Sequence, residues 1–376
     1  MNKKVAYFTN IAPHYREKLW LGLAGSQKME FHFFFGHSGS GIKEMNFDAD
    51  EWKDYKNNLH KVRNIRLRGR LVFQTGVITK ILFRKWDVII FLGDANLVSN
   101  WIGVTLARLK GVKVAYWGHG LYGQERGLSK WLRLLFLSMA NANLTYGEWA
   151  KSKMTKEGFK ASTIKVIYNS LDYQTSRKIR DHVVQQDYLY EKGIFKTKAP
   201  ILLFIGRLTP QKKLDILIDA VGKLKNNGLH FNLLIIGDGP ERSKLERMAT
   251  ENGISCYFYG ECYDEMTNAS LIANADLCVS PGNVGLTAIH SLSYGTPLCT
   301  HNNFANQMPE FEAIEEGVTG CYFDEKKKNI EQAIERWFAK KPDREQVRKD
   351  CYFVIDEKYN PNVQVKIMEE MVNELA

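Results

Sequence analysis

The sequence predicts an α/β protein of two Rossmann-like, doubly wound domains. Short apolar runs alternate with longer helical patterns along the chain, which is typical of parallel α/β units. These units form two similar series, one in each half, and a charged, polar stretch separates them. Two such series favour two sheets over one large sheet. The 376 residues are enough for two domains of about 100–200 residues each.

The expected strands follow the apolar runs. The first series comprises Val5–Thr9, Phe31–Phe35, Val88–Leu92, Val112–Trp117, Ala142–Tyr146 and Ile164–Tyr168. The second series comprises Ile201–Ile205, Leu233–Ile236, Cys256–Tyr259, Leu277–Ser280, Pro297–Thr300 and Gly320–Phe323. We therefore predict an N-terminal domain over residues 1–172, a linker over 173–198 and a C-terminal domain over 199–359. Residues 360–376 have apolar side chains at helical spacing, and we expect this helix to pack back on the first domain.

Composition narrows the class of protein without deciding it. The net charge of +10 favours an anionic partner, and nucleic acid, a membrane surface or a phosphorylated substrate would all satisfy it. Nucleic acid is disfavoured because no interleaved aromatic and basic motif is present. The six cysteines form no CxxC pair and several lie in apolar runs, so reduced thiols are expected. No segment resembles a secretory signal or a membrane span of about 20 apolar residues, which predicts a cytoplasmic location.

Two cations bracket the turn after the first strand of the second series. Arg207 follows that strand, and Lys212 precedes the apolar pattern of a helix. Ligands of open α/β sheets bind at the carboxyl ends of the strands. A guanidinium and an ammonium group there suit a diphosphate. A solvated basic turn would account for this stretch alone equally well.

Two further strand-to-helix turns carry glycines. The sequence Gly237-Asp-Gly239-Pro240 follows one strand, and a loop from Gly282 to Gly285 follows another. A helix is expected from about Leu286 to Tyr294, and the N–H groups of Val284 to Thr287 at its start would face an anion. Three such turns at one sheet edge rarely arise by chance, so together they predict a phosphate-binding site.

These segments resemble the C-terminal domain of retaining GT-B glycosyltransferases of the family-four (glycosyl transferases group 1) type. The shared features are a strand followed by G-R-x-x-x-x-K, a G-x-G-P turn, an aromatic-Gly turn at Tyr259-Gly260, and Gly285-Leu286 at a helix start. The resemblance covers roughly residues 199–323. It implies two domains facing across a cleft and metal-independent transfer of a hexose or related sugar from a nucleoside-diphosphate sugar.

The resemblance assigns roles to individual residues of the C-terminal half. Arg207 and Lys212 would be catalytic, holding the donor diphosphate and stabilising the leaving group. The donor site would be formed by Gly206, Arg207, Lys212, Gly237, Gly239, Gly260, Asn283, Val284, Gly285, Leu286, Thr287 and His290. The family usually carries two glutamates eight positions apart, where this chain has Gly282 and His290. Neutral His290 keeps one acceptor nitrogen for the ribose, toward which we expect it to point.

In the N-terminal half, the resemblance points to a histidine at a strand end. His119 lies between two glycines after the expected strand Val112–Trp117, where the family has a residue that contacts the donor sugar. Weaker candidates for the acceptor side follow other strands: Pro13, His14, Arg16 and Asp94. The pair Asp48 and Asp50 matches a D-x-D metal motif, but a solvated acidic loop explains it better. We therefore expect no metal and no cofactor beyond the donor substrate.

The expected function is sugar transfer to a glycan or polyprenyl-linked glycan in bacterial surface polysaccharide synthesis. The segment Arg126–Met139 is basic and amphipathic, so an anionic membrane surface is a further candidate partner, with peripheral binding to the inner face of the membrane. A core helix is the alternative for this segment. Two other classes also remain open for the whole chain: a nucleoside-diphosphate-sugar 2-epimerase, and a degenerate, non-catalytic protein that binds glycans or nucleotides.

Overall fold

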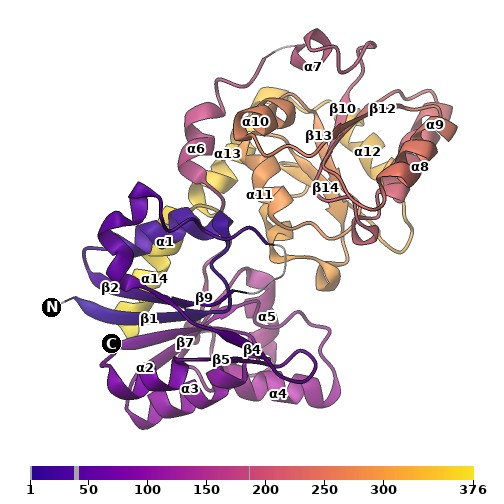
Figure 1. Ribbon diagram of the computed structural model, residues 1–376. Helices are drawn as coiled ribbons and strands as arrows, with labels where there is room; N and C mark the ends of the chain where they lie inside the picture. Colours follow the sequence, from indigo (N-terminus) through magenta and orange to yellow (C-terminus); the bar gives the residue numbers. More distant parts are fainter. Residues whose placement is uncertain (1, 38–41, 186) are drawn as a thin grey trace. The chain divides into compact units, whose positions relative to one another are not determined.

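The computed structural model describes residues 2–37, 42–185 and 187–376 (Figure 1). The chain divides into two compact units. The first unit comprises Met1–Asp172 and Asn360–Ala376, and the second comprises Tyr173–Tyr359. Each unit contains a parallel sheet with helices on both faces, which confirms the predicted fold class of two Rossmann-like halves.

The sheet of the first unit has the order β3-β2-β1-β6-β7-β8-β9, and every pair in it is parallel. Its strands are β1 (Lys3–Thr9), β2 (Met29–Phe35), β3 (Leu59–Lys61), β6 (Val88–Leu92), β7 (Lys113–Gly118), β8 (Ala142–Thr145) and β9 (Ile164–Val166). The antiparallel hairpin of β4 (Asn64–Arg66) and β5 (Val72–Gln74) lies outside this sheet. The sequence did not predict β3, β4 or β5, because each is only three residues long and lacks an apolar run.

Both faces of this sheet are buried. Along β1, Val5 and Tyr7 belong to one hydrophobic cluster while Ala6 and Phe8 belong to the other, as the alternation of side chains along a strand requires. The helices α1 (Glu17–Ala24) and α14 (Pro361–Leu375) contribute to the first cluster. The opposite cluster takes side chains from α2 (Val77–Phe83), α3 (Val98–Leu109), α4 (Gly127–Ser138) and α5 (Glu148–Lys156).

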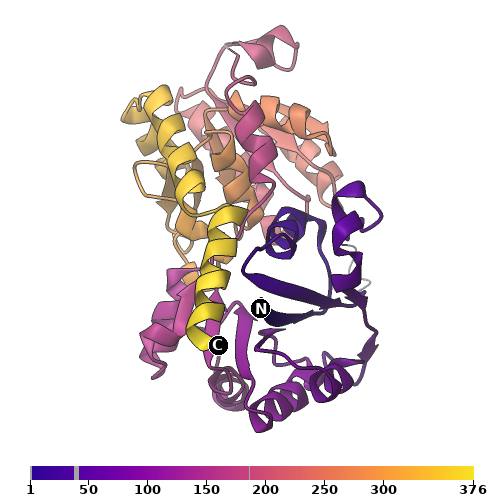
Figure 2. The ribbon, with the colours of Figure 1, turned by 90° about the vertical axis from the view of Figure 1, so that its left-hand side faces the viewer.

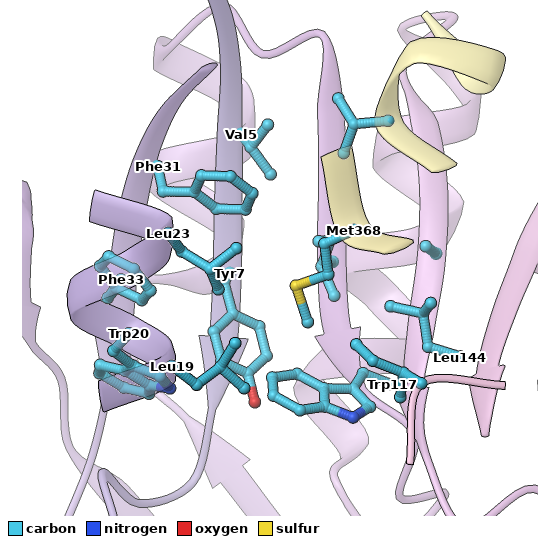
Figure 3. Close-up of a cluster of buried hydrophobic side chains, with 14 of the residues drawn as sticks. Val5, Tyr7, Leu19, Trp20, Leu23, Phe31, Phe33, Trp117, Leu144 and Met368 are labelled. Atoms are coloured by element: carbon cyan, nitrogen blue, oxygen red, sulfur yellow. The ribbon is translucent and has the colours of Figure 1, made fainter. Parts of the chain in front are cut away.

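The last helix, α14, belongs to the first unit although the whole second unit precedes it in the chain. Met368 reaches into the cluster formed with Tyr7 and Trp117 (Figure 3). The amide of Gln364 donates to the carbonyl of Tyr168 at 3.1 Å. Both chain termini therefore lie in one unit (Figure 2).

The sheet of the second unit has the order β12-β11-β10-β13-β14-β15, which is the doubly wound Rossmann order. Its strands are β10 (Ile201–Ile205), β11 (Asn232–Ile236), β12 (Ser255–Gly260), β13 (Leu277–Ser280), β14 (Leu298–His301) and β15 (Gly320–Phe323). Its helices are α6 (Tyr173–Ile179), α7 (Tyr188–Glu191), α8 (Leu214–Asn226), α9 (Arg242–Glu251), α10 (Glu265–Ala273), α11 (Leu286–Ser293), α12 (Ile330–Ala339) and α13 (Arg344–Glu357).

The stretch 173–198, predicted as a linker, is part of the second unit. It contains α6 and α7, and the guanidinium of Arg180 donates two hydrogen bonds of 2.8 Å to the carboxylate of Asp356. The backbone N–H of Gln185 donates to the side chain of Asn274 at 2.9 Å. These contacts attach the polar stretch to the body of the unit, so its polarity reflects an exposed position and not a boundary.

Candidate functional site

The three glycine-containing turns of the second unit meet at the carboxyl ends of β10, β11 and β13. These strands are adjacent in the sheet, and the strand order reverses beside β10, where ligands of open α/β sheets bind. The N–H of Gly206 donates to the carbonyl of Ile236 at 2.9 Å, and the N–H of Gly237 donates to that of Gly260 at 2.7 Å. The predicted turns are therefore in direct contact.

Glycine is required where these turns pack on one another. A Cβ at Gly237 would lie 2.1 Å from the carbonyl oxygen of Gly206, and the φ of Gly237 is +130°. A Cβ at Gly239 would lie 2.3 Å from the carbonyl oxygen of Leu208. The backbone of the G-x-G-P turn can thus approach the first turn only without side chains.

Lys212 and Arg207 lie in different environments. Lys212 is the last residue of the 3₁₀ turn Pro210–Lys212. Its ammonium group donates to the carbonyl of Asn283 at 2.9 Å. Burial lowers the pKa of Lys212, and the nearby Glu310 acts against this shift. Arg207 is exposed at the end of β10. One cation is therefore held against the third turn while the other projects into solvent.

The start of α11 carries only part of the predicted anion site. The N–H of Val284 donates to the side chain of buried Gln307 at 2.8 Å, so it is not free to face an anion, contrary to the sequence prediction. The N–H groups from Gly285 to Thr287 lie in the first turn of the helix, where intrahelical acceptors are lacking. The hydroxyl of Thr287 donates to the carbonyl of Ile205 at 3.2 Å and ties this turn to β10.

The two positions that depart from the family pattern behave differently. A Cβ at Gly282 would lie 2.1 Å from the carbonyl oxygen of Gln211, so any side chain there requires the turn at 210–212 to move. The Nε2 atom of His290 lies 3.1 Å from a carboxylate oxygen of Glu265, at the start of α10. His290 therefore contacts a carboxylate that approaches from a neighbouring helix.

Glu265 contacts the predicted site residue His290, and sequence reasoning did not single it out. Its carboxylate accepts from the hydroxyl of Tyr294 at 2.5 Å as well as facing His290. Burial raises the pKa of Glu265, but the hydrogen bonds from His290 and Tyr294 outweigh burial and hold the pKa below its usual value. The available signal was its position, five residues after Gly260, in the turn that leads from β12 into α10.

In the first unit, a cavity of about 440 Å³ opens at the carboxyl ends of β1, β6 and β7. The predicted residues Pro13, Arg16, Asp94 and His119 all line this cavity. His14 does not, because its side chain is exposed and its Nδ1 atom lies 3.1 Å from the carbonyl oxygen of Lys43. Three of the four acceptor-side candidates thus gather with the candidate catalytic histidine.

His119 is held as a neutral imidazole in this cavity. It directly follows β7, its ring stacks on Tyr122 with centroids 5.3 Å apart, and its buried Nδ1 atom has no partner among the described residues. Burial lowers its pKa to about 4, and the positive charges of Arg16 and Arg133 act in the same direction. A neutral histidine with an unsatisfied ring nitrogen is ready to exchange a hydrogen bond with a ligand hydroxyl.

Two arginines of this cavity were not predicted as site residues. Arg133 lies on α4 and donates from Nε to the carbonyl of Gly120 at 2.8 Å. Arg70 lies in the turn of the β4–β5 hairpin. The sequence placed Arg133 in a basic amphipathic helix and gave no reason to single out Arg70, because each reaches the cavity only through tertiary packing.

Asp48 and Asp50, the D-x-D pair, lie at the entry to a 3₁₀ helix of the first unit (Asp50–Asn58). The backbone N–H of Asp48 donates to the side chain of Asn46 at 3.2 Å. Within the described ranges, the structure shows no group of three or more acidic, histidine or cysteine side chains arranged to hold a metal ion.

Two Rossmann-like units in one chain define the GT-B class of fold, and comparison with solved structures agrees. The lipopolysaccharide outer core galactosyltransferase WaaB, in its apo form, aligns over 99% of this chain and 100% of its own with a TM-score of 0.70 and 15% identity. Anabaena HepE in complex with UDP aligns over 99% and 100% with a TM-score of 0.69 and 15% identity. At these identities the likeness establishes the fold.

Residues 186–352 match the family model of glycosyl transferases group 1. A GDP-mannose-dependent alpha-(1-6)-phosphatidylinositol dimannoside mannosyltransferase of Mycobacterium tuberculosis is 41% identical over 100 residues, which cover 26% of this chain and 26% of that protein. The chain matches only about a quarter to a third of the length of such curated relatives.

Proposed function

We propose that this protein transfers a hexose or related sugar from a nucleoside-diphosphate sugar to a glycan or lipid-linked glycan, with retention of configuration. The observation that carries the proposal is the meeting of three glycine-containing turns with Arg207 and Lys212 at the carboxyl ends of adjacent strands. The family match of residues 186–352, and the fold shared with a UDP complex, support the donor class. A role in bacterial surface polysaccharide synthesis is part of the proposal.

In this proposal the second unit binds the donor. Arg207 and Lys212 neutralise the diphosphate and stabilise the leaving group, so that the protein supplies the charge that a metal ion supplies elsewhere. The first turn of α11 donates backbone N–H groups to the same phosphates. Glu265 takes the place of the absent glutamates and accepts from the ribose hydroxyls, while His290 orients it through their contact of 3.1 Å.

The first unit binds the acceptor and supplies His119. As a neutral imidazole, His119 exchanges hydrogen bonds with hydroxyl groups of the reacting sugars and stabilises the charge that develops during transfer. Asp94 lines the same cavity and orients acceptor hydroxyls. One of its oxygens accepts from the backbone and side chain of Asn96 at 3.0 and 2.8 Å, which fixes the carboxylate in place.

A two-stage donor screen tests this function. Thermal unfolding is measured with UDP, GDP, ADP and their hexose conjugates, because a ligand that binds the folded state raises the midpoint. A donor that raises the midpoint is then incubated with glycan acceptors, and transfer is measured by mass spectrometry with and without a chelator. We expect transfer that persists with the chelator. Failure of every nucleotide to protect would contradict the proposal.

The same screen separates the two other classes. A nucleoside-diphosphate-sugar 2-epimerase would convert the donor to its 2-epimer without any acceptor, which nuclear magnetic resonance of the sugar detects. A degenerate binding protein would be stabilised by glycan or nucleotide and would produce neither product. The G-R-x-x-x-x-K pattern, with Arg207 and Lys212, favours sugar transfer over epimerisation, since two positive charges in this turn suit a leaving nucleoside diphosphate.

Peripheral membrane binding through α4 is the second part of the proposal. This helix buries only Phe136 and Leu137 fully, so a core position explains just its C-terminal end. Four of its other apolar side chains are exposed: Leu128 by 72%, Trp131 by 57%, Leu132 by 41% and Leu135 by 41%. In the described part of the chain, no helix has the length and apolar character to cross a bilayer. The exposed face of α4 is suited to lie in the membrane interface.

Vesicle sedimentation tests this surface. Trp131→Ala and Leu128→Ala should each weaken binding to anionic vesicles by about ten-fold or more, because burying such a side chain contributes about 1.5–3 kcal/mol. Leu109→Ala is the matched control, since Leu109 is 79% exposed at the end of α3. Equal vesicle binding by all three variants and the wild type would rule out α4 as the contact.

A further inference from the structure

The cavity of the first unit has a strongly positive lining. Three arginines line it, Arg16, Arg70 and Arg133, against a single carboxylate, Asp94. Its volume of about 440 Å³ lies within the range of small-molecule sites. The positive charge of these arginines is therefore gathered around one cavity that opens to solvent.

Arg16 is the most unusual of these side chains. It is 9% exposed, and its guanidinium centre lies 4.5 Å from the ring of Trp117 and 5.4 Å from that of Tyr146. Its terminal nitrogens donate to the hydroxyls of Tyr146 and, at 3.5 Å, Tyr7. Its Nε atom has no partner among the described residues, which also provide no carboxylate as an ion-pair partner.

A buried guanidinium needs an opposite charge. Burial lowers the pKa of Arg16, yet the hydroxyl groups of Tyr146, Tyr7 and Tyr15 hold the pKa above its ordinary value, so the group remains charged. Neutral hydroxyls and ring faces stabilise this charge but do not neutralise it. A buried charge without a counter-ion costs several kcal/mol. A protein can keep such a destabilising buried charge where a bound ligand supplies the missing anion.

The other arginines extend the positive charge across the cavity. Arg133 is partly balanced, because its Nε atom lies 3.7 Å from a carboxylate oxygen of Glu125. Arg70 is exposed in its hairpin turn and has no hydrogen-bond or ion-pair partner within the described ranges. Asp94 directs one oxygen to Asn96, as described above. The net charge around the cavity thus remains positive without a ligand.

We propose that this cavity binds a sugar through an oxyanion, a phosphoryl or carboxylate group whose oxygens accept from Arg16 and Arg70. That the bound sugar is the acceptor rests on the proposed function, whereas the anionic site itself does not. Guanidinium groups bind planar pairs of oxygens in a bidentate manner, which suits both oxyanions. His119, in the same cavity, then meets the hydroxyl groups of the sugar. The acceptor class is accordingly an anionic sugar and not a neutral one.

Calorimetric titration of the full chain with four probes tests the site: glucose 1-phosphate, glucuronate, neutral methyl glucoside and inorganic phosphate. We expect at least one anionic sugar to bind measurably more tightly than methyl glucoside and than inorganic phosphate. The better of the two anionic sugars identifies the oxyanion as phosphoryl or carboxylate. Equal affinity for charged and neutral sugars would overturn the proposal. So would inorganic phosphate binding as tightly as the sugar phosphate, because the cavity would then recognise a free anion.

Three variants locate the contact. Arg16→Met should weaken binding of the preferred anionic sugar by about 10- to 100-fold, as the loss of a charge-assisted hydrogen bond predicts. Arg70→Gln should weaken it less, since Arg70 is exposed. Arg68→Gln is the matched control, because Arg68 is exposed in the same hairpin turn but does not line the cavity. Unchanged affinity in Arg16→Met would overturn the proposal.

The unfolding midpoint separates a ligand contact from a structural role. Replacing an uncompensated buried charge by an apolar side chain is often neutral or stabilising, so ligand-free Arg16→Met should unfold at the wild-type temperature or above it. A lower midpoint would mean that Arg16 serves the fold and would overturn the proposal. Should Arg16→Met fail to fold, Arg16→Lys keeps the charge without the planar fork, and wild-type affinity in that variant would exclude bidentate recognition.

Titration with the best nucleotide of the donor screen keeps the two proposals distinguishable. That nucleotide should bind Arg16→Met as it binds the wild type, because its contacts lie in the second unit. If the nucleotide needs Arg16, the cavity belongs to the donor site and the anionic-acceptor proposal is wrong. If no nucleotide binds while an anionic sugar still does, the proposed transferase function fails and the anionic site remains.

Discussion

The two units have the same topology at the point where the strand order reverses, but the residues that lie there differ between the units. In the second unit, turns after β10, β11 and β13 pack so closely that only glycine fits, and the polar groups at the surface are backbone N–H groups and two cations. In the first unit, the ends of β1, β6 and β7 enclose a cavity with a buried arginine and a neutral histidine.

This difference suggests how one fold serves two ligands. A backbone surface with helix N–H groups recognises phosphates without regard to the rest of the molecule. A cavity lined by side chains discriminates by shape, charge and hydroxyl position. The second unit is therefore expected to be general among nucleotide sugars, whereas the first unit is expected to determine the acceptor. The predictions below test this division in order of decreasing effect.

The largest effect is expected at the cations of the second unit. Arg207→Ala and Lys212→Ala should each lower turnover by about 10²–10³-fold, because a charge contact to the leaving diphosphate is lost in the transition state. Lys213→Gln is the matched control, since the neighbouring Lys213 pairs with Glu325 at 2.6 Å. Steady-state kinetics with the donor from the screen measures all three. Near-normal turnover in both alanine variants would contradict the assignment of the donor diphosphate to these cations of the second unit.

A smaller loss is expected at Glu265. Glu265→Gln should weaken nucleoside diphosphate binding by about 1.5–3 kcal/mol, the worth of hydrogen bonds to a charged group, while His290→Ala should cost only about 0.5–1.5 kcal/mol. Calorimetric titration of the single and double variants measures both values and their coupling. A larger loss in His290→Ala than in Glu265→Gln would show that the imidazole, and not the carboxylate, meets the ribose.

Gly282 tests whether the family's absent glutamate can be restored. Gly282→Glu should lower the free energy of unfolding by about 1–3 kcal/mol, because its Cβ would lie 2.1 Å from the carbonyl oxygen of Gln211. Urea denaturation followed by circular dichroism measures this change, and Lys213→Gln again serves as control. Tighter nucleotide binding without loss of stability would mean that the turn at 210–212 yields easily and that the second unit is less rigid than its packing indicates.

The smallest effect concerns pH and the first unit. The pKa of His119 is about 4 in the folded protein and about 6.5 when unfolded, so between these values the unfolded chain binds the additional proton. Folding stability should therefore fall by about 1.4 kcal/mol per pH unit as the pH drops below 6.5. His119→Gln should remove this part of the slope, leaving the parts from His32 and His60, whose pKa values burial also lowers.

Tryptophan fluorescence makes that measurement specific to one unit. Trp337 lies in the second unit and the other seven of the eight tryptophans lie in the first. Urea unfolding at pH 7 and pH 5.5, followed by fluorescence, compares the wild type with His119→Gln. An identical dependence on pH in both proteins would show that His119 is protonated in the folded first unit, and its role as a neutral imidazole would be withdrawn.

Local patterns predicted the strands that are long and apolar. β10, β13 and β15 have the bounds expected from the sequence, because each is an apolar run with a clear boundary: Gly206 follows β10, Ser280 ends β13 and Gly320 begins β15. The short strands β3 to β5 were missed because pairing partners, and not their own residues, make them strands. The stretch 173–198 was misread as a linker because polarity alone does not distinguish a surface segment from a boundary.

The candidate site was predictable where the glycines of a turn and its charged side chains lie in the same short segment of sequence. Gly206 to Lys212 and Gly237 to Gly239 stand out in the sequence by their glycine and cation spacing, and the structure brings the two turns together. Glu265, Arg70 and Arg133 reach their sites by tertiary packing, for which no local pattern exists. The N–H of Val284 donates to the side chain of Gln307, which is distant in sequence, and a local pattern could not reveal this hydrogen bond.

The position of α14 sets the order in which the protein is completed during synthesis. Met368, Met371 and Val372 are part of the core beneath β1, yet a ribosome makes them after the whole second unit. The second unit is a continuous segment and can therefore fold first, although it begins at residue 173. Until α14 emerges, one face of the first sheet has only part of its cover, from α1. The apolar surface that α14 later buries is where a nascent chain of this protein would need protection from aggregation.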